Sequence, residues 1–303
     1  MKKIHVAVIV AAVVLAGGVS FGTYSGHGQS QNQKNDSTVK AAVTVTALAR
    51  SNEETAASNF RGAAARNATL QNELEWTFGG KQQRGWRLYD SLIASTLKTS
   101  SEPISSDFAL TLSNWQKKAG LNPNGVLDED TFKTMVAEWQ RNRLKDHAYA
   151  QTNELITAPT SDFYDSERLP ELRQVERNTY LAYKRMVEAA IADPSLNLRH
   201  TGEGQLAPEE KYFKIVSAFR SREYQNQLRR QSPNAGSAGL AVNSPHSTGR
   251  ALDFYVGGDP VDTNDSNRAI QVKTPLYQWL VRNAGRFGFR PYFYEPWHWE
   301  YIK

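Results

Sequence analysis

The stretch that decides the fold is Ser-Pro-His-Ser-Thr-Gly-Arg-Ala-Leu-Asp-Phe, residues 244–254 of the 303-residue chain. Residues 251–255 alternate in a way that predicts a half-buried β-strand with a period of two. Asp253 therefore lies among apolar neighbours, where a lone carboxylate is costly unless a metal ion or a cation accompanies it. Gly249 fits the bend between this strand and the loop that carries His246.

A second motif closes the chain, Tyr-Glu-Pro-Trp-His-Trp-Glu-Tyr at residues 294–301. It adds His298 to His246 and Asp253, and two imidazoles with one carboxylate form the ligand set of a catalytic zinc with one open position for water. Zinc lowers the pKa of such a water molecule to about 7, so the three residues predict a metallohydrolase that cuts an amide bond. A purely structural zinc ion is the alternative, although structural sites normally close all four positions with protein ligands.

Two glutamates near His298 compete for the role of the base that transfers the proton. Glu300 shares a strand face with His298 by the period of two, whereas Glu295 lies on the opposite face if the strand is regular. Pro296 argues against a regular strand, because proline cannot donate to a ladder and restricts the residue before it. From the residues alone, both assignments stay open.

Composition narrows the class of protein. A chain of 303 residues allows about two domains, and its 22% charged and 40% hydrophobic residues are ordinary for a globular protein. The net charge of +5 is spread along the chain without a dense basic run, which argues against nucleic-acid binding. Mild basicity suits an anionic polymer such as a cell wall. Because the chain has no cysteine, disulfides and thiolate zinc sites are excluded.

The N-terminus predicts export. Met1-Lys2-Lys3 precedes an apolar run that continues to residue 19, and residues 1–24 therefore predict a signal peptide or an uncleaved membrane anchor. Residues 25–69 begin rich in Gly, Ser, Gln and Asn, which predicts a flexible tether. We expect an extracytoplasmic protein, whether periplasmic, secreted or anchored in the cell envelope. It would meet a membrane only through its first segment, if that segment is uncleaved.

Residues 70–145 predict a small domain of three helices, because apolar residues recur at helical spacing in three places. The three sets are Leu88, Leu92 and Ile93; Phe108, Leu112, Trp115 and Ala119; and Phe132, Met135, Val136 and Trp139. Asn-Pro and Asn-Gly pairs at residues 122–125 predict a tight turn before the last helix. Asp128 or Asp130 can cap that helix.

This three-helix unit resembles the peptidoglycan-binding domain found beside many cell-wall hydrolases. The resemblance rests on residues 112–116, 120–125 and 131–140, and it implies binding to the peptidoglycan of the wall. Leu127-Asp128 stands where the family usually has a Phe-Gly or similar pair. A plain helical spacer is the alternative.

The remaining sequence divides into a polar linker at 146–166 and a larger domain at 167–303. The domain opens with a predicted helix over 167–192, followed by a strand rich in aromatic and β-branched residues at 212–220. Ser221 can cap the next helix, expected over 222–230. Helices and short strands that are not spaced as βαβ units predict an α+β domain with a small antiparallel sheet.

Residues 167–303 resemble the vancomycin-resistance type D-alanyl-D-alanine carboxypeptidases, which belong with the zinc peptidases named for lysostaphin, D-Ala-D-Ala and sonic hedgehog. Four blocks in the family's order carry the resemblance: residues 217–221 with Gln225, residues 244–253, residues 279–289, and residues 295–298. The resemblance implies a Zn²⁺-dependent hydrolase of peptidoglycan stem peptides, most often at the D-Ala-D-Ala bond.

The resemblance also assigns roles to residues. Glu295, three positions before the last ligand, is the base, and Arg220 presents its planar fork to the substrate carbonyl and its oxyanion. Gln225 and Ser244 hold the polar ends of the peptide. Many relatives carry a longer loop where only residues 290–294 stand here, which leaves open an endopeptidase that cuts an L-Ala-D-Glu or cross-link bond. A non-catalytic wall-binding protein of the same fold is the remaining alternative.

Overall fold

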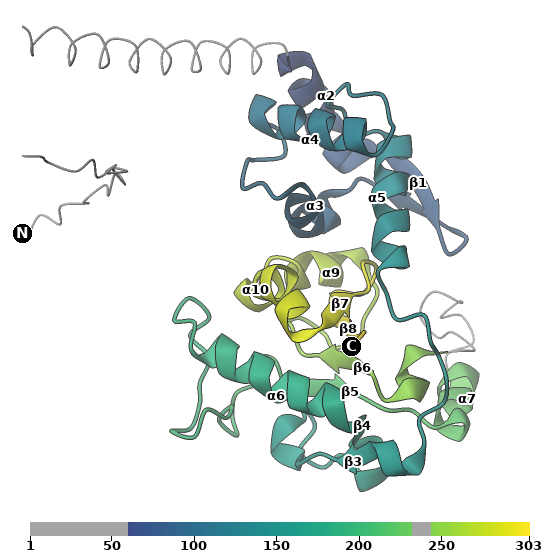
Figure 1. Ribbon diagram of the computed structural model, residues 1–303, viewed down its shortest axis with the longest axis vertical. Helices are drawn as coiled ribbons and strands as arrows, with labels where there is room; N and C mark the ends of the chain where they lie inside the picture. Colours follow the sequence, from purple (N-terminus) through teal and green to yellow (C-terminus); the bar gives the residue numbers. More distant parts are fainter. Residues whose placement is uncertain (1–59, 232–243) are drawn as a thin grey trace, which may run out of the picture. The chain divides into compact units, whose positions relative to one another are not determined.

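The computed structural model describes residues 60–231 and 244–303. Every described residue belongs to one compact unit, Glu53–Lys303 (Figure 1). The predicted signal segment at 1–24 and the predicted tether as far as residue 59 lie outside the described residues. Within the described ranges, no helix has the length and apolar character needed to cross a bilayer.

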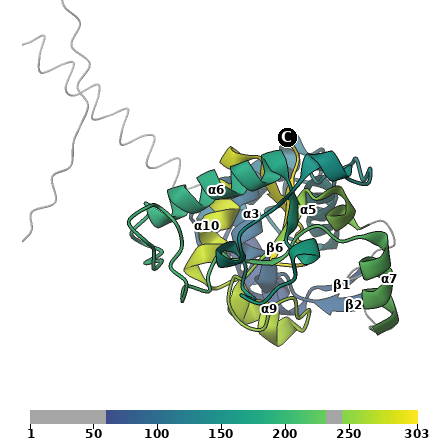
Figure 2. The same ribbon diagram turned by 90° about the horizontal axis from the view of Figure 1, so that it is seen from below.

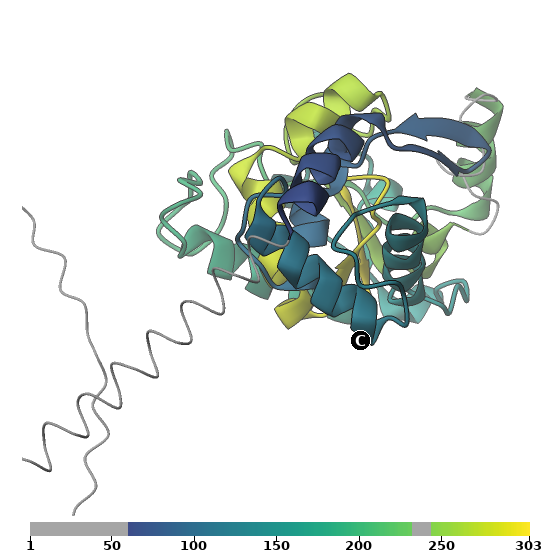
Figure 3. The same ribbon diagram turned by 90° about the horizontal axis from the view of Figure 1, so that it is seen from above.

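Residues 61–141 form four α-helices and one β-hairpin, the helical segment of this protein. The elements are α2 (Arg61–Glu73), β1 (Glu75–Phe78), β2 (Lys81–Arg84), α3 (Asp90–Leu97), α4 (Ser106–Lys118) and α5 (Glu129–Arg141). The helices predicted from apolar spacing are present as α3, α4 and α5, and the Asp128 side chain caps α5 as expected. The segment also contains α2 and the hairpin, which the sequence did not predict. The hairpin belongs to the same core, because the Trp76 ring of β1 packs edge-on against Phe132 of α5 at 4.9 Å. Figure 3 shows the hairpin extending away from the helices.

The N-terminal boundary of the helical segment lies earlier than the sequence predicted. Residues 61–69, which the composition placed in the tether, form the first turns of α2. The buried Asn67 amide donates to the Gly125 carbonyl and accepts from the backbone N–H of Leu127. Gly125 has φ of 71°, and a Cβ there would lie 2.6 Å from the Ala109 carbonyl, so the turn requires glycine. Composition could not reveal this tie, because its two ends lie far apart in the sequence.

The connection between the helical segment and the larger sheet contains short elements of its own. These are the 3₁₀ helices Thr152–Glu154 and Thr160–Asp162 and the strand β3 (Leu155–Thr157), which pairs antiparallel with β4 (Gln174–Glu176). The helix predicted over 167–192 begins later, as α6 (Arg177–Ile191). The reason lies in Pro170, which opens a 3₁₀ turn, and in Glu176, whose carboxylate caps α6 by accepting two backbone N–H groups.

The main sheet has four antiparallel strands in the order β5-β6-β8-β7 (Figure 1). Their bounds are Ile215–Ser217 for β5, Ala251–Phe254 for β6, Phe289–Pro291 for β7 and His298–Tyr301 for β8. Helix α6 packs against one face of the sheet, where Tyr183 stacks on Phe254 at 5.5 Å (Figure 2). The remaining helices are α7 (Arg222–Gln231), α9 (Asp265–Gln271) and α10 (Pro275–Asn283). This mixture of helices and small antiparallel sheets confirms the predicted α+β class.

Strand β6 differs from the prediction in its burial. All four of its residues are buried, whereas the alternating pattern predicted one solvated face. The second face is covered because Asp253 receives side chains from three other segments, those of Arg220, His246 and His298.

Two apolar cores lie within residues 60–303, and the second joins the helical segment to the sheet region. The first fills the space between α6, the sheet and α10. The second contains the aromatic side chains of the helical segment together with residues 292–294, which precede β8. The Phe78 ring of β1 packs against Phe293 at 4.7 Å and against Tyr294 at 5.1 Å. The helical segment and the residues that lead into the strand of His298 are therefore packed into a common core.

Candidate metal centre

The three predicted metal ligands come from neighbouring strands and one tight loop. Asp253 lies directly opposite His298 in the β6–β8 pairing, so the backbone register brings the two side chains together. His246 lies in a 3₁₀ helix, Pro245–Thr248, that ends at Gly249 with φ of 67°. A Cβ at Gly249 would lie 2.9 Å from the backbone nitrogen of Glu176, so glycine allows the loop to approach β4 closely.

The ligand atoms converge on one point. His246 Nε2 lies 3.2 Å from one oxygen of Asp253, and His298 Nδ1 lies 2.9 Å from the other. The potential ligand atoms of the three residues all lie within 4.8 Å of one another, and all three side chains are buried. Two imidazoles and a carboxylate in this arrangement suit zinc with an open fourth position.

The second ring nitrogen of each histidine is held by the protein. His246 Nδ1 lies 2.7 Å from the Ala218 carbonyl oxygen, to which it can only donate. His298 Nε2 lies 3.2 Å from a Glu300 oxygen. Metal-bound histidines usually donate their other ring N–H to a carbonyl or a carboxylate, which fixes the tautomer and the ring orientation. The described residues therefore fit a bound metal ion in their outer contacts as well as in their ligand set.

The pKa values within the cluster diverge strongly. Burial lowers the pKa of His246 to about 4, and the nearby Arg220 guanidinium acts in the same direction. Burial opposes the charged forms of Asp253 and His298 as well. At Asp253 the charge and hydrogen bond of His246, followed by those of His298, outweigh burial, and at His298 the hydrogen bond to Asp253 does so. The pKa of Asp253 is held well below its usual range and that of His298 is raised to about 9, with Glu300 contributing to the second shift. A metal ion that bound at His298 would displace a proton from it.

Glu295 lies on the ligand side of the His298 ring. Its carboxylate is buried and lies 3.9 Å from His298 Nδ1. Burial raises the pKa of Glu295 to about 7. The charge of His298 opposes this shift, and the negative charge of Asp253 adds to it by a smaller amount. The strand β8 begins only at His298, and Glu295 lies in the preceding turn, where its N–H donates to the Tyr292 carbonyl. Because Glu295 lies outside the strand, the alternation of side chains along β8 does not determine the face on which Glu295 lies.

Glu300 lies on the other side of the same ring. Its carboxylate is fully buried and accepts from His298 Nε2, from the Arg143 guanidinium, and from the backbone N–H of Leu144 at 2.9 Å. Although burial opposes ionisation, the hydrogen bond and charge of His298, with Arg143 beside it, lower the pKa of Glu300 to about 2. Of the two candidate bases, Glu295 has the pKa and the position suited to proton transfer at the ligand side.

The other predicted site residues lie on the segments next to the ligands. The Arg220 guanidinium donates to Asp253 at 2.8 Å and to Ser217 Oγ at 3.0 Å, so it reaches the cluster. Ser244 caps the 3₁₀ helix of His246 by accepting from its backbone N–H, at the long distance of 3.4 Å. Gln225 is buried on α7. The roles of Arg220, Gln225 and Ser244 toward a substrate stay predictions.

A family model described as VanY, D-alanyl-D-alanine carboxypeptidase, matches residues 143–303, which is more than half of the chain. The chain belongs to this family. Membership of the VanY family indicates a carboxypeptidase-type peptidase that acts on peptidoglycan. The match begins before the predicted linker at 146–166, so the connection after α5 is part of the VanY region.

The chain is also similar to a solved structure. A solved structure described as "Structure of the LdcB LD-carboxypeptidase reveals the molecular basis of peptidoglycan recognition" is similar at 23% sequence identity. The similarity covers 52% of this chain and 71% of that chain, with a TM-score of 0.34. No curated protein gives a significant match.

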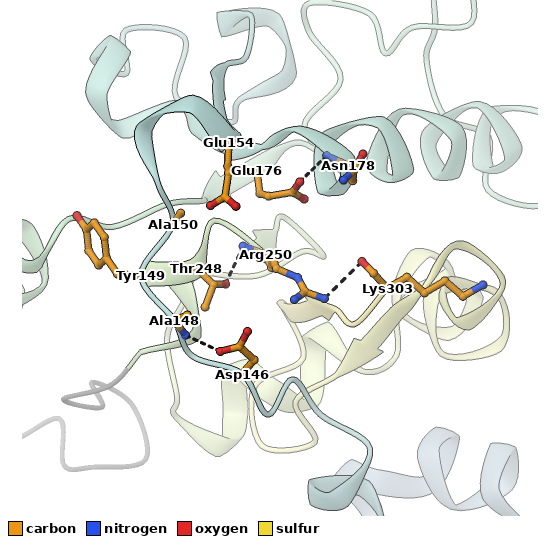
Figure 4. Close-up of a pocket in the computed structure, with 10 residues that line it drawn as sticks. All are labelled: Asp146, Ala148, Tyr149, Ala150, Glu154, Glu176, Asn178, Thr248, Arg250 and Lys303. Carbon is orange, nitrogen blue, oxygen red and sulfur yellow. Dashed lines mark hydrogen bonds between the residues drawn. The ribbon is translucent and has the colours of Figure 1, made fainter.

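The sequence did not predict the outer contacts of the candidate metal centre. No local sequence pattern marks the groups that make these contacts, which are Arg143, Leu144 and the Ala218 carbonyl. Arg143 and Glu300, for example, are 157 positions apart in the sequence. A pocket of about 250 Å³ is lined in part by the connection after α5, and Figure 4 shows Arg250 among its lining residues, hydrogen bonded to Thr248 and Lys303. None of the described residues that line this pocket is a predicted site residue.

Proposed function

We propose that this protein is a zinc-dependent peptidase that hydrolyses peptidoglycan stem peptides at the D-Ala-D-Ala bond. The convergence of His246, Asp253 and His298 within 4.8 Å, in a chain of the VanY family, is the observation that carries the proposal. When bound, zinc would acidify a water molecule and polarise the scissile carbonyl. His246 Nε2, one Asp253 oxygen and His298 Nδ1 are the atoms that would hold it.

The residues around this set have separate tasks in the proposed reaction. Glu295 takes the proton from the attacking water and returns it to the leaving amine, a task that suits a carboxyl group with a pKa of about 7. Arg220 stabilises the negative charge that develops on the carbonyl oxygen, because its planar fork already reaches the cluster at Asp253. Gln225 and Ser244 hold the polar ends of the peptide.

We propose that this activity takes place in the cell envelope. Residues 1–24 would export or anchor the protein, residues 25–60 would tether it, and the helical segment would bind the wall. The basic start and apolar run of the first segment support export. Resemblance to peptidoglycan-binding domains over residues 112–140 supports wall binding.

The metal dependence of the proposed activity can be tested with two matched aspartate variants. The wild-type chain should bind about one zinc ion and release D-alanine from a peptide that ends in D-Ala-D-Ala. Asp253→Asn should lose both properties. Asp162→Asn is the control, because Asp162 is also a buried, ion-paired aspartate but its partners are Lys184 and Tyr180. Full hydrolysis by wild-type protein that a chelator has freed of metal would overturn the proposal.

A further inference from the structure

One carboxylate links the ligand His298 to the helical segment. Glu300 is the only fully buried carboxylate on β8, where it follows His298 by two residues and accepts from its Nε2 at 3.2 Å. Arg143, which follows α5, donates to the same oxygen from Nε at 3.1 Å and from a second guanidinium nitrogen that lies still closer. The backbone N–H of Leu144 donates to the other oxygen at 2.9 Å. Two of the three partners of Glu300 thus come from the junction after the helical segment.

Arg143 is itself held in place from both sides of this junction. Its Nη1 donates to the Gln140 side chain of α5 at 3.1 Å. Its guanidinium also lies over the Tyr292 ring, 3.9 Å from the centroid, and the Tyr292 ring packs edge-on against the His298 ring at 5.8 Å. An amide, an aromatic face and a carboxylate thus restrain the planar guanidinium of Arg143, so its position is well defined.

The chain that follows Arg143 continues along the metal centre. The backbone N–H of Ala150 donates to the Ser247 carbonyl at 3.0 Å, within the loop that carries His246. The Tyr149 ring packs edge-on against Phe219 at 5.4 Å, next to Arg220. Residues 143–150, which we call the strap, therefore contact the strand that carries His298, the loop that carries His246 and the segment that carries Arg220.

We propose that Arg143 is a positioning residue of the metal centre, and that through Glu300 and His298 it couples the helical segment to metal binding. A buried carboxylate without a cationic partner is strongly disfavoured, so the contact with Arg143 keeps the Glu300 side chain in place. Glu300 in turn accepts the Nε2 proton of His298 and leaves Nδ1 directed at Asp253. This inference rests on the proposed function, because it requires that the cluster binds zinc. Through the contact of Arg143 with Gln140, the end of α5 would support the metal centre, in addition to the proposed role of the helical segment in wall binding.

The test measures zinc affinity of the full chain by competition with a chromophoric chelator. Loss of an outer-shell partner typically lowers metal affinity 10- to 100-fold, so Arg143→Ala should weaken zinc binding by about that factor. Arg141→Ala removes an arginine from the exposed end of α5, only two residues away, and should leave the affinity within about twofold of wild type. Arg143→Lys keeps the charge but loses the fork, and should restore part of the affinity. It is also the variant to use if Arg143→Ala does not fold.

A double-mutant cycle separates positioning from general destabilisation. In the Glu300→Gln background, Arg143→Ala should cause almost no further loss of zinc affinity, because the two residues act through one contact. Zinc binding within about twofold of wild type in folded Arg143→Ala, or losses that multiply fully in the double variant, would overturn the inference. If the wild-type chain itself binds no zinc, the proposed function fails first. If the wild type binds zinc and hydrolyses peptide while Arg143→Ala binds it equally well, only the present inference fails.

Discussion

Removal of the Glu295 carboxylate should separate proton transfer from metal binding. Glu295 is buried 3.9 Å from His298 Nδ1, with its pKa raised to about 7, and a base must be ionised to act. With that pKa, about a tenth of the molecules carry the carboxylate at about pH 6 and about nine-tenths at about pH 8. We therefore expect kcat/KM to rise about tenfold between these pH values in the wild-type protein.

The variant Glu295→Gln keeps the size of the side chain and removes the titrating group. Because general acid–base catalysis typically contributes about 10²- to 10⁴-fold, turnover should fall by that factor and the rise with pH centred near 7 should disappear. The assay follows D-alanine release from a peptide ending in D-Ala-D-Ala across the pH range, with zinc at saturation and occupancy confirmed by metal analysis.

Glu300→Gln is the matched control for this prediction, since it removes a buried carboxylate that contacts His298 and is not one of the three candidate metal ligands. At equal zinc occupancy it should lower turnover only a few-fold, because Glu300 meets the ring nitrogen that faces away from the ligands. The reasoning is refuted if Glu300→Gln abolishes turnover with zinc retained while Glu295→Gln stays near normal. A wild-type pH profile that is flat between 6 and 8 would also contradict the assigned pKa.

Two further predictions concern the helical segment. Gln116→Ala should lower the free energy of unfolding by about 2–4 kcal/mol in urea titrations, because it leaves several buried hydrogen-bonding groups unpaired. The buried amide of Gln116 donates to Asn124, Val126 and Thr131 and accepts from the N–H of Gly125. A change below about 0.5 kcal/mol would be inconsistent with that network. The soluble chain without residues 1–24, carrying Glu295→Gln to prevent digestion, should pellet with purified peptidoglycan sacculi, and its retention in the supernatant at low salt would make the segment a spacer.

The parts of the fold that the sequence predicted are those governed by local rules. The spacing of His246 and Asp253 predicted a loop followed by a strand, and β6 begins two residues after the glycine of that loop. Apolar residues at helical spacing predicted α4 and α5, and the Asp128 cap followed from the preference of short polar side chains for helix N-termini. In each case the decisive interactions lie within a few residues of sequence.

What the sequence could not predict depends on contacts between distant residues. The pairing of Arg143 with Glu300 joins parts of the chain that share no local pattern. The face on which Glu295 lies was undecided because Pro296 interrupts the strand, so that β8 begins at His298. The burial of both faces of β6 also depends on distant residues. An alternating pattern shows which positions are polar, but it does not show which side chains from other segments cover them.

Mass spectrometry of purified muropeptides, after incubation with the soluble chain lacking residues 1–24, tests most directly whether this protein is a metal-dependent carboxypeptidase of the cell wall. The proposed function predicts that muropeptides with a pentapeptide stem lose a single terminal alanine in the presence of zinc, and that Asp253→Asn leaves them unchanged. Intact pentapeptide stems after incubation with zinc-loaded wild-type protein, or cross-linked dimers cleaved within the stem while terminal alanines remain, would contradict it.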